Sequence, residues 1–447
     1  MNIIHVCGWY FPDSLGGTEA YVAAVAERQK RAGHTVAIAA PDPGGHLDRA
    51  YEHEGLPVYR YPIPPIPTRD EAQHRRPVRG TERLHAWLGE RRPDVVHFHT
   101  FVTGVGPFEI RAARAAGARV IVTTHSGSLG FTCQRGTMLR WGRRLCDGRV
   151  GAIKCAACEL QHRGVPRPVA DALGVLSLPV AGAARLIPGK AGSLLGMPAL
   201  IAHNRHLQRQ ILADVDAFVV LTEWARGVVA ANHGNGAPVV LNRLGVRATA
   251  EGVRELAARP RQRRPGHLRI AYLGRFDRIK GVHDLARAVR ALPRSAQVHV
   301  EFRGPISNTR ELTISNELKA IVGPDVWVQF GQPIEPSRVF EYLQSVDLLC
   351  CPSRTLEGGP TVALEAMAVG TPVLAARIGA LAELVADGVN GRLVPPGDWR
   401  ALSRAIAEIA SDPAGTIDRW ARALPPLRTM DDVTADYMRL YGSASRP

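Results

Sequence analysis

Residues 270–281 read Ile-Ala-Tyr-Leu-Gly-Arg-Phe-Asp-Arg-Ile-Lys-Gly, and a helical pattern follows from Val282 to Leu292. A short apolar strand that leads through a glycine-bounded loop into a helix is the repeating unit of a parallel α/β sheet. Because the same unit recurs before and after this stretch, the sequence predicts an α/β fold with doubly wound sheets.

Apolar runs of strand length mark the repeats. In the first half they are Ile3–Val6, Thr35–Ala39, Val95–Phe98, Val120–Thr123, Asp216–Leu221 and Pro238–Leu241. In the second half they are Ile270–Leu273, Val298–Phe302, Val326–Phe330, Leu348–Cys351, Pro372–Ala375 and Gly391–Val394. Helical patterns such as 19–31 and 399–409 separate them, so each half is expected to form its own sheet, covered by helices on both faces.

A chain of 447 residues is long enough for two such domains. We expect a first domain over 1–250, with an insertion at 133–206 where the rhythm breaks, and an exposed linker over 251–267. A second domain is expected over 268–425, and a C-terminal helix within 426–447 that packs across the junction. Ligands bind at the carboxyl ends of strands in open α/β sheets, which predicts a site in a cleft between the two domains.

The net charge is +15, and basic residues cluster in 135–167 and 259–264. This excess favours an anionic ligand or an anionic membrane surface. No helix-turn-helix, RNA-recognition or paired zinc-finger pattern supports a nucleic-acid partner. The start lacks the features of a signal peptide, and the apolar run 172–184 is too short to cross a bilayer, so we expect a cytoplasmic protein with peripheral contact to the inner face of the membrane.

Two loops carry residues suited to a sugar nucleotide. Arg275 and Lys280 bracket a strand-to-helix turn, where two cations and a helix N-terminus suit a diphosphate; the alternative is a solvated basic loop. Glu357 and Glu365 bracket a second such loop, whose amides at Gly359, Thr361 and Val362 could hold a phosphate. Carboxylates repel phosphate, so these two better accept hydrogen bonds from sugar hydroxyls. The alternative is one acid beside the helix dipole and one solvated acid.

The first half offers two weaker signals. Gly16 and Gly17 follow the first strand, where glycines allow the backbone to approach a ligand, and Thr18 is expected to cap the next helix; a turn without a ligand is the alternative. His125 ends a predicted strand that faces the expected cleft. It is either a satisfied polar group or a ligand contact.

Taken in order and spacing, these motifs resemble family-4 glycosyltransferases of the GT-B fold, which place two Rossmann-like domains about a cleft. The resemblance implies that Arg275 and Lys280 bind the donor diphosphate, Glu365 the ribose and Glu357 the transferred sugar, with His125 beside the reacting centre. The residues that the resemblance places around the reacting atoms form the implied catalytic set: His125, Glu357, Arg275 and Lys280. The implied donor-binding set is Gly16, Gly17, Arg275, Lys280, Glu357, Gly358, Gly359, Thr361, Val362 and Glu365.

The resemblance further implies transfer, with retention of configuration, from a nucleotide-diphosphate sugar to a glycan or lipid-linked acceptor, as in synthesis of cell-envelope polysaccharide. The alternatives are an epimerase or phosphorylase on the same fold, and a non-catalytic basic protein that binds nucleic acid or membranes. The pair Asp214 and Asp216 precedes a strand, is interpreted as a helix end, and predicts no catalytic metal.

The insertion carries its own signals. Cys133, Cys146, Cys155 and Cys158 lie among arginines, and thiols at i and i+3 form a chelating pair, so a structural zinc is the leading interpretation; an iron–sulfur cluster and unliganded thiols are the alternatives. The apolar part, 165–201, suits an interfacial segment or a lid over an acceptor channel. Equally, it could cover the sheet of the first domain.

Overall fold

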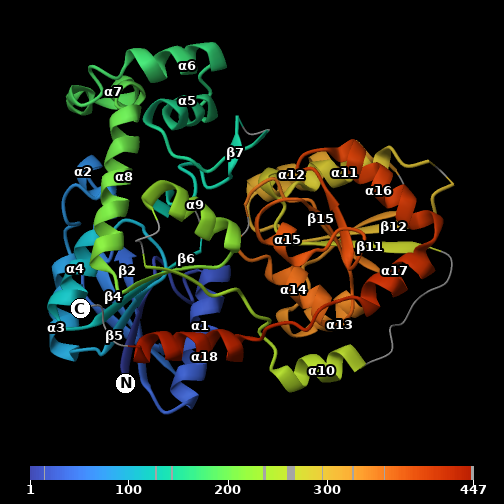
Figure 1. The fold of residues 1–447 in the computed structure, drawn as a ribbon, viewed down its shortest axis with the longest axis horizontal. Coiled ribbons are helices and arrows are strands. Elements are labelled where there is room, and N and C mark those ends of the chain that lie inside the picture. The colour runs from blue at the N-terminus through green and yellow to red at the C-terminus, as the bar shows by residue number, and fades with distance from the viewer. Residues whose placement is uncertain are drawn as a thin grey trace. The chain divides into compact units, whose positions relative to one another are not determined.

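The computed structural model describes residues 1–14, 16–125, 128–141, 144–234, 238–258, 267–293, 295–324, 327–356 and 358–443. The chain forms two compact units: unit 1 is Met1–Arg243 with Asp432–Pro447, and unit 2 is Leu244–Asp431. Each unit is built on a predominantly parallel sheet with helices packed around it (Figure 1). The prediction of two doubly wound, Rossmann-like α/β domains is therefore confirmed.

The sheet of unit 1 has the strand order β10-β9-β6-β5-β1-β2-β4-β3. Its strands are β1 (Asn2–Val6), β2 (Thr35–Pro43), β3 (Arg49–His53), β4 (Leu56–Ile63), β5 (Val95–Phe98), β6 (Arg119–Thr124), β9 (Ala217–Val220) and β10 (Val239–Leu241). The chain adds strands on one side of β1 and then, from β5 onward, on the other. This reversal creates a switch point between β1 and β5, where a ligand crevice is expected.

Helices cover this sheet because its strands are apolar on both faces. They are α1 (Gly17–Arg31), α2 (Arg69–Ala72), α3 (Thr81–Arg91), α4 (Pro107–Ala115), α9 (Glu223–His233) and α18 (Met430–Gly442). Phe98, Val120 and Phe218 are among the fully buried side chains at the centre of the core. All six predicted strand runs of this half fall on observed strands.

The sequence pattern missed β3 and β4. Strand β4 carries Pro57 and Pro62, which count against a strand inside a sheet. It also carries Arg60, which is almost fully buried, where an unpaired charge would be costly. Here Nη1 of Arg60 lies 2.7 Å from Oδ2 of Asp13, and its Nε and Nη2 donate to the carbonyl oxygen of Pro41. The burial is compensated by partners that lie far away in the sequence.

The predicted insertion forms a helical subdomain with a short hairpin. Its elements are β7 (Leu139–Arg140), β8 (Arg144–Leu145), α5 (Ala152–His162), α6 (Arg167–Leu176), α7 (Gly189–Leu195) and α8 (Met197–Asp214). Figure 1 shows α5, α6 and α7 gathered at one end of α8, away from the sheet. A small core of its own includes Leu160, Ala170 and Ile201. The apolar segment therefore packs mainly on itself and not over the sheet.

The sheet of unit 2 has the order β13-β12-β11-β14-β15-β16, and all its pairings are parallel. The strands are β11 (Leu268–Leu273), β12 (Val298–Arg303), β13 (Val328–Gly331), β14 (Leu348–Cys351), β15 (Val373–Ala376) and β16 (Gly391–Val394). The helices are α10 (Ala250–Ala258), α11 (Val282–Arg290), α12 (Thr309–Val322), α13 (Val339–Gln344), α14 (Thr361–Ala368), α15 (Gly379–Leu384), α16 (Trp399–Ser411) and α17 (Pro413–Arg422). The switch point of this sheet lies between β11 and β14.

The boundaries differ from the prediction at two places. Residues 250–258, placed mostly in an exposed linker, form helix α10, whose Leu256 packs against the core of unit 2; residues 259–266 lie outside the described part. The first unit ends at Arg243, and residues from Asp432 onward belong to it again. Within the described ranges, no helix combines the length and the apolar character that a bilayer crossing requires.

Candidate functional site

Two loops meet at the switch point of unit 2. One follows β11 and spans 274–281, and the other follows β14 and spans 352–360. Gly281 has a φ of +72°, and a Cβ atom there would lie 1.8 Å from the carbonyl oxygen of Pro352. The amide of Arg354 donates to the carbonyl oxygen of Ile279 at 2.8 Å. Glycine at 281 therefore permits a close backbone contact that joins the two loops.

An ion pair between half-buried Arg354 and buried Asp284 fixes this contact. Nε of Arg354 lies 2.5 Å from Oδ2 of Asp284, and its Nη2 bonds the other carboxylate oxygen. Asp284 is in the first turn of α11 and is almost fully buried. A two-point bond between a guanidinium and a carboxylate fixes direction as well as distance. The sequence motifs did not indicate Arg354 or Asp284, because only the fold brings them together.

Arg275 and Lys280 lie at the two ends of the first loop. Between them, Phe276 is buried in the core, and the side chain of Asp277 accepts a hydrogen bond from the amide of Ile279 at 3.1 Å. The hydroxyl of Tyr272 donates to the carbonyl oxygen of Arg275 at 2.7 Å. The Arg275 side chain is exposed, and Lys280 is half-buried. The loop is thus anchored between two cations at the carboxyl end of β11.

Helix α14 begins where the second loop ends. The amides of Ala363 and Leu364 both donate to the carbonyl oxygen of Pro360, which leaves the amides of Thr361 and Val362 at the helix start. A Cβ atom on Gly359 would meet Cδ1 of Leu244 at 1.4 Å, so this backbone is tightly enclosed. Such a helix start favours an anion.

Glu365 lies in the second turn of α14, as predicted, and is half-buried. Burial raises the pKa of its carboxyl, and the nearby Arg247 partly offsets this effect. Glu357 falls outside the described residues, and Gly358 is the first described residue after it. Of the predicted donor residues in unit 2, the structure therefore brings Arg275, Lys280 and the start of α14 to one edge of the sheet.

In unit 1 the glycine pair begins α1. Gly16 is the residue before the helix, and the helix starts at Gly17, so the expectation that Thr18 caps it is wrong. A Cβ atom on Gly16 would lie 2.2 Å from Oε2 of the buried Glu19, whose Oε1 accepts a hydrogen bond from Ser14 at 2.8 Å. Nothing lies within 4 Å of the corresponding position on Gly17. Gly16 makes room for a carboxylate, and Gly17 leaves the helix start open.

His125 follows β6 and begins a chain of side chains that leads into unit 1. Its Nε2 lies 3.2 Å from Nδ1 of His99, and Nε2 of His99 lies 2.9 Å from Nδ1 of His5. Nε2 of His5 lies 2.7 Å from Oε1 of Gln29. Burial lowers the pKa of His125 to about 3 and that of His5 to about 4, against an ordinary value of 6.5. All these imidazoles are therefore neutral near pH 7.

A second branch runs beside this chain. His97 bonds the hydroxyl of Tyr441 at 2.6 Å and that of Thr123 at 2.7 Å, and Thr123 bonds Tyr437 at 2.8 Å. Burial holds the pKa of His97 well below its usual value. Sequence reasoning missed this group. The spacing of His97 and His99 was the available signal, since His97 is on β5, His99 follows directly after it, and residues two apart in extended backbone share one face.

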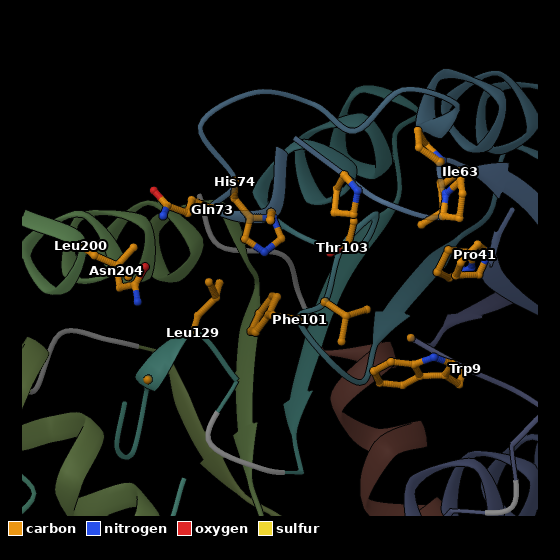
Figure 2. Close-up of a pocket in the computed structure, with 18 of the residues that line it drawn as sticks. Trp9, Pro41, Ile63, Gln73, His74, Phe101, Thr103, Leu129, Leu200 and Asn204 are labelled. Atoms are coloured by element: carbon orange, nitrogen blue, oxygen red, sulfur yellow. The ribbon is translucent and has the colours of Figure 1, made fainter. Parts of the chain in front are cut away.

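A cavity with a volume of about 540 Å³ lies at the switch point of unit 1 (Figure 2). Loops after β1 and β5 supply Trp9, Phe101 and Thr103, while His74, Leu129 and Asn204 come from other segments. A Cβ atom on Gly8 would clash with Val102 at 2.8 Å, so glycine allows the two loops to approach. The volume suits a small ligand such as a sugar.

The predicted metal residues lie elsewhere. Cys133, Cys146, Cys155 and Cys158 all line one small cavity in the insertion. Asp214 ends α8, as interpreted, while Oδ2 of Asp216 accepts a hydrogen bond from the amide of Val120 at 2.8 Å. Asp216 therefore has a structural role, in which its side chain binds the backbone of β6.

Comparison with known proteins gives the family. Residues 16–245 match the glycosyl transferase 4-like domain, and residues 254–423 match the glycosyl transferases of group 1. A D-inositol 3-phosphate glycosyltransferase of Streptomyces avermitilis is 30% identical over 341 residues, which cover 74% of this chain. The chain spans only 61% of the length of that relative.

Solved structures agree in fold. A sucrose-phosphate synthase from Thermosynechococcus elongatus has a TM-score of 0.63 at 18% identity, covering 99% of this chain and 98% of its own. HepE of Anabaena, in complex with UDP and glucose, has a TM-score of 0.60 at 13% identity, covering 99% and 100%. The predicted GT-B class of two Rossmann-like domains is thereby confirmed. With both halves matched in order, the chain belongs to the group 1 glycosyl transferases that carry a glycosyl transferase 4-like domain.

Proposed function

We propose that this chain transfers a sugar from a nucleotide-diphosphate donor to a glycan or lipid-linked acceptor, with retention of configuration. The donor occupies the switch point of unit 2. The observation that carries this proposal is the joined pair of loops, in which the bond between Arg354 and Asp284 holds the loop of Arg275 and Lys280 against the loop before α14.

The chemistry follows from the charges at this edge. Two cations and a helix N-terminus stabilise the negative charge that grows on the departing diphosphate as the sugar–oxygen bond breaks. On the retaining, front-face route, an oxygen of that diphosphate accepts the proton of the acceptor hydroxyl while the new glycosidic bond forms on the same face. The carboxylate of Glu365 accepts hydrogen bonds from the ribose. His125, neutral at pH 7, contacts the donor sugar.

The 540 Å³ cavity of unit 1 is the proposed acceptor pocket. Gln134 lines it, and its Oε1 accepts a hydrogen bond from Asn204 at 2.8 Å. Its Nε2 is buried and has no hydrogen-bond partner within the described ranges. A buried donor without a partner is costly, so this group is suited to an acceptor oxygen. Both side chains come from the insertion, which therefore contributes to acceptor choice.

A second cavity favours a lipid-linked acceptor over a free glycan. It has a volume of about 240 Å³ and shares Gln73 and Leu200 with the acceptor pocket. Its charged lining consists of Arg69, Arg75 and Arg163, together with His203, and includes no carboxylate among the described residues. Burial lowers the pKa of His203, and Arg75 lowers it further, while the hydrogen bond to the carbonyl oxygen of Gln73 and the charge of Asp70 act in the opposite direction. Such a lining suits a phosphate group.

Exposed apolar side chains occur in the same chain segment as two residues of this basic cavity. Leu176 is 73% exposed and Leu186 is 77% exposed, and both belong to the segment around Ala181 and Gly182, which line the cavity. Large apolar side chains grouped beside cations are typical of a surface that binds an anionic membrane. We therefore place the lipid end of the acceptor at residues 169–187, with the protein bound peripherally to the membrane.

The experiment is incubation of the purified chain with a panel of sugar nucleotides, each with and without an extract of lipid-linked acceptors. The expected result is release of nucleoside diphosphate and a glycosylated lipid only when both substrates are present, with the anomeric configuration of the donor kept in the product by NMR. Conversion of a sugar nucleotide into an isomer without acceptor would instead identify an epimerase. Transfer with inverted configuration would overturn the front-face route.

A further inference from the structure

The cysteines of the insertion lie around one cavity. Its volume is about 30 Å³, and the lining includes all four of these cysteines, Cys133, Cys146, Cys155 and Cys158. A cavity of this size holds one or two small species such as water molecules. The thiols come from three separate segments. Cys133 is 22 residues from Cys155 and 25 residues from Cys158 in the sequence, so the fold brings them to one cavity.

The backbone presents each thiol in a defined way. Cys133 opens a turn in which the amide of Gly136 donates to its carbonyl oxygen at 2.9 Å, and Gly136 has a φ of +68°. Cys146 follows β8, and its amide donates to the carbonyl oxygen of Met138 at 2.8 Å. Cys155 and Cys158 stand three residues apart on α5 and therefore share one face.

The positive charges around the cavity suit a metal centre that carries a net negative charge. Arg135, Arg140, Arg149 and Lys154 line it with the cysteines, and Nη1 of Arg135 lies 3.8 Å from Sγ of Cys158. Four thiolates around a divalent ion carry a net charge of −2. Lys154 already pairs with Asp147 at 2.5 Å, and the positive charge of Arg135, Arg140 and Arg149 at the edge would compensate the charge of such a centre.

The hairpin of the insertion has little regular structure of its own. Strands β7 and β8 have two residues each, and an isolated two-stranded hairpin is marginal in water. The apolar core of the insertion gathers α5, α6 and α8, and it does not include the hairpin. Asn232 of α9 bonds the backbone of Gly148 and Val150 after the hairpin, and a cross-link between the hairpin and α5 would add a second fixed point.

We propose that Cys133, Cys146, Cys155 and Cys158 bind one structural zinc ion as a tetrathiolate site. Zinc–sulfur bonds of about 2.3 Å would hold the hairpin to the start of α5. The site would also fix one wall of the unit 1 cavity, because Gln134 lines both that cavity and the cysteine-lined one. This proposal stands independently of the proposed transfer reaction.

One other group competes for a metal. The ligand nitrogens of His5, His97 and His99 all lie within 4.8 Å of one another, a closeness that no set of three of these cysteines reaches among the described residues. Those nitrogens, however, already bond Gln29, Tyr441 and Thr123, and a metal would break these buried bonds. The thiols make only long contacts in the described residues, from Cys146 to Asp147 at 3.6 Å and from Arg135 to Cys158 at 3.8 Å, so zinc would displace weaker bonds here and is expected to draw the sulfurs together.

The test is elemental analysis of the full chain, purified in the presence of a thiol reductant and without added metal. About one zinc per chain is expected, released in step with the reaction of four thiols with a mercurial reagent. Iron with visible absorption would overturn zinc in favour of a cluster. The absence of metal, or zinc lost on desalting with no change in thiol reactivity, would overturn the site altogether.

A matched pair of variants locates the ion. Cys155→Ser combined with Cys158→Ser should lose the zinc, while Cys351→Ser, at the end of β14 in unit 2, should keep it. Should the double variant not fold, wild-type protein treated with a strong zinc chelator replaces it. Proteolysis is then expected to begin within residues 133–165, and re-addition of zinc should restore protection. Unchanged proteolysis after zinc removal would contradict a structural role.

Discussion

Nδ1 of His99 lies 3.2 Å from Nε2 of His125, so the residue proposed to contact the donor sugar is held by a buried neighbour. Because His99 is bonded in turn to His5, the ring of His125 is fixed from within unit 1. His99 is thus a positioning residue. It acts on the sugar only through His125.

Replacement of His99 tests this relationship. We expect His99→Leu to lower kcat by about 10-fold with little change in the KM for the donor, because a misplaced group costs rate more than binding. His99→Asn keeps a polar atom near the position of Nδ1 and should recover much of the loss. Steady-state kinetics on both variants give the answer. Equal losses in the two variants would indicate a packing role only.

The buried histidines predict acid sensitivity. Their folded pKa values lie below the unfolded value of 6.5, so the unfolded chain binds more protons as pH falls, and stability decreases below about pH 6.5. Each contributes at most about 1.4 kcal/mol per pH unit. His125→Gln removes one such group, so its thermal midpoint should fall less steeply between pH 6.5 and 5 than that of the wild type. Between pH 7 and 8 the two curves should run parallel; a difference in slope there would contradict the assignment.

The proposed role of Arg275 and Lys280 in binding the donor diphosphate predicts large losses of activity from single substitutions. Arg275→Ala and Lys280→Ala should each lower turnover by on the order of 100-fold, because each removes a cation from the developing charge. Arg310→Ala, an exposed residue paired with Asp277, is the matched control and should retain activity. Near-normal turnover in the Arg275 or Lys280 variant would show that the substituted residue does not bind the donor diphosphate.

Glu365 predicts a pH dependence of donor binding. Burial raises the pKa of this carboxyl, so it takes up a proton at a higher pH than an ordinary glutamate. The ionised form accepts the ribose hydrogen bonds, and therefore the KM for the donor should increase as pH falls through that raised pKa. Glu365→Gln should show a higher KM that no longer changes with pH. A wild-type KM that is constant across the acid range would refute this role.

The exposed apolar segment predicts binding to vesicles. Leu176→Ser combined with Leu186→Ser should weaken flotation with phosphatidylglycerol vesicles by about 10-fold or more, because both side chains lose apolar contact with the lipid. Leu47→Ser is a matched control, since Leu47 is 76% exposed elsewhere in unit 1. Equal flotation of all three proteins would exclude this segment as the membrane contact.

The parts of the fold that could be predicted are those that residues close together in the sequence determine. Apolar strands followed by helices identified both sheets, and the loop of Arg275 and Lys280 was found because its residues are adjacent in sequence. Strand β4 was missed because Arg60 becomes tolerable in the core through partners outside the strand, among them Asp13 and Pro41. Likewise, the bond between Arg354 and Asp284 joins residues 70 apart, and no local rule reports such a pair.

The candidate site follows the same division. Glu365 was placed correctly because helix periodicity fixes its turn, whereas the network of His97, Thr123 and Tyr437 depends on a helix more than 300 residues later in the chain. Thr18 was assigned as a cap from its residue type, but the helix begins one residue earlier. Tertiary contacts decide such positions.

Tyr437 and Tyr441 of α18 close the interior of unit 1 over His97 and Thr123, although all of unit 2 separates them along the chain. On the ribosome, the first domain would therefore emerge with its polar centre uncovered and wait through the synthesis of nearly 190 further residues before its last helix arrives. The second unit can fold as one continuous piece in the meantime. Completion of the first unit is then a late event in biogenesis, and truncations that spare every residue proposed here for catalysis would still leave an unfinished protein.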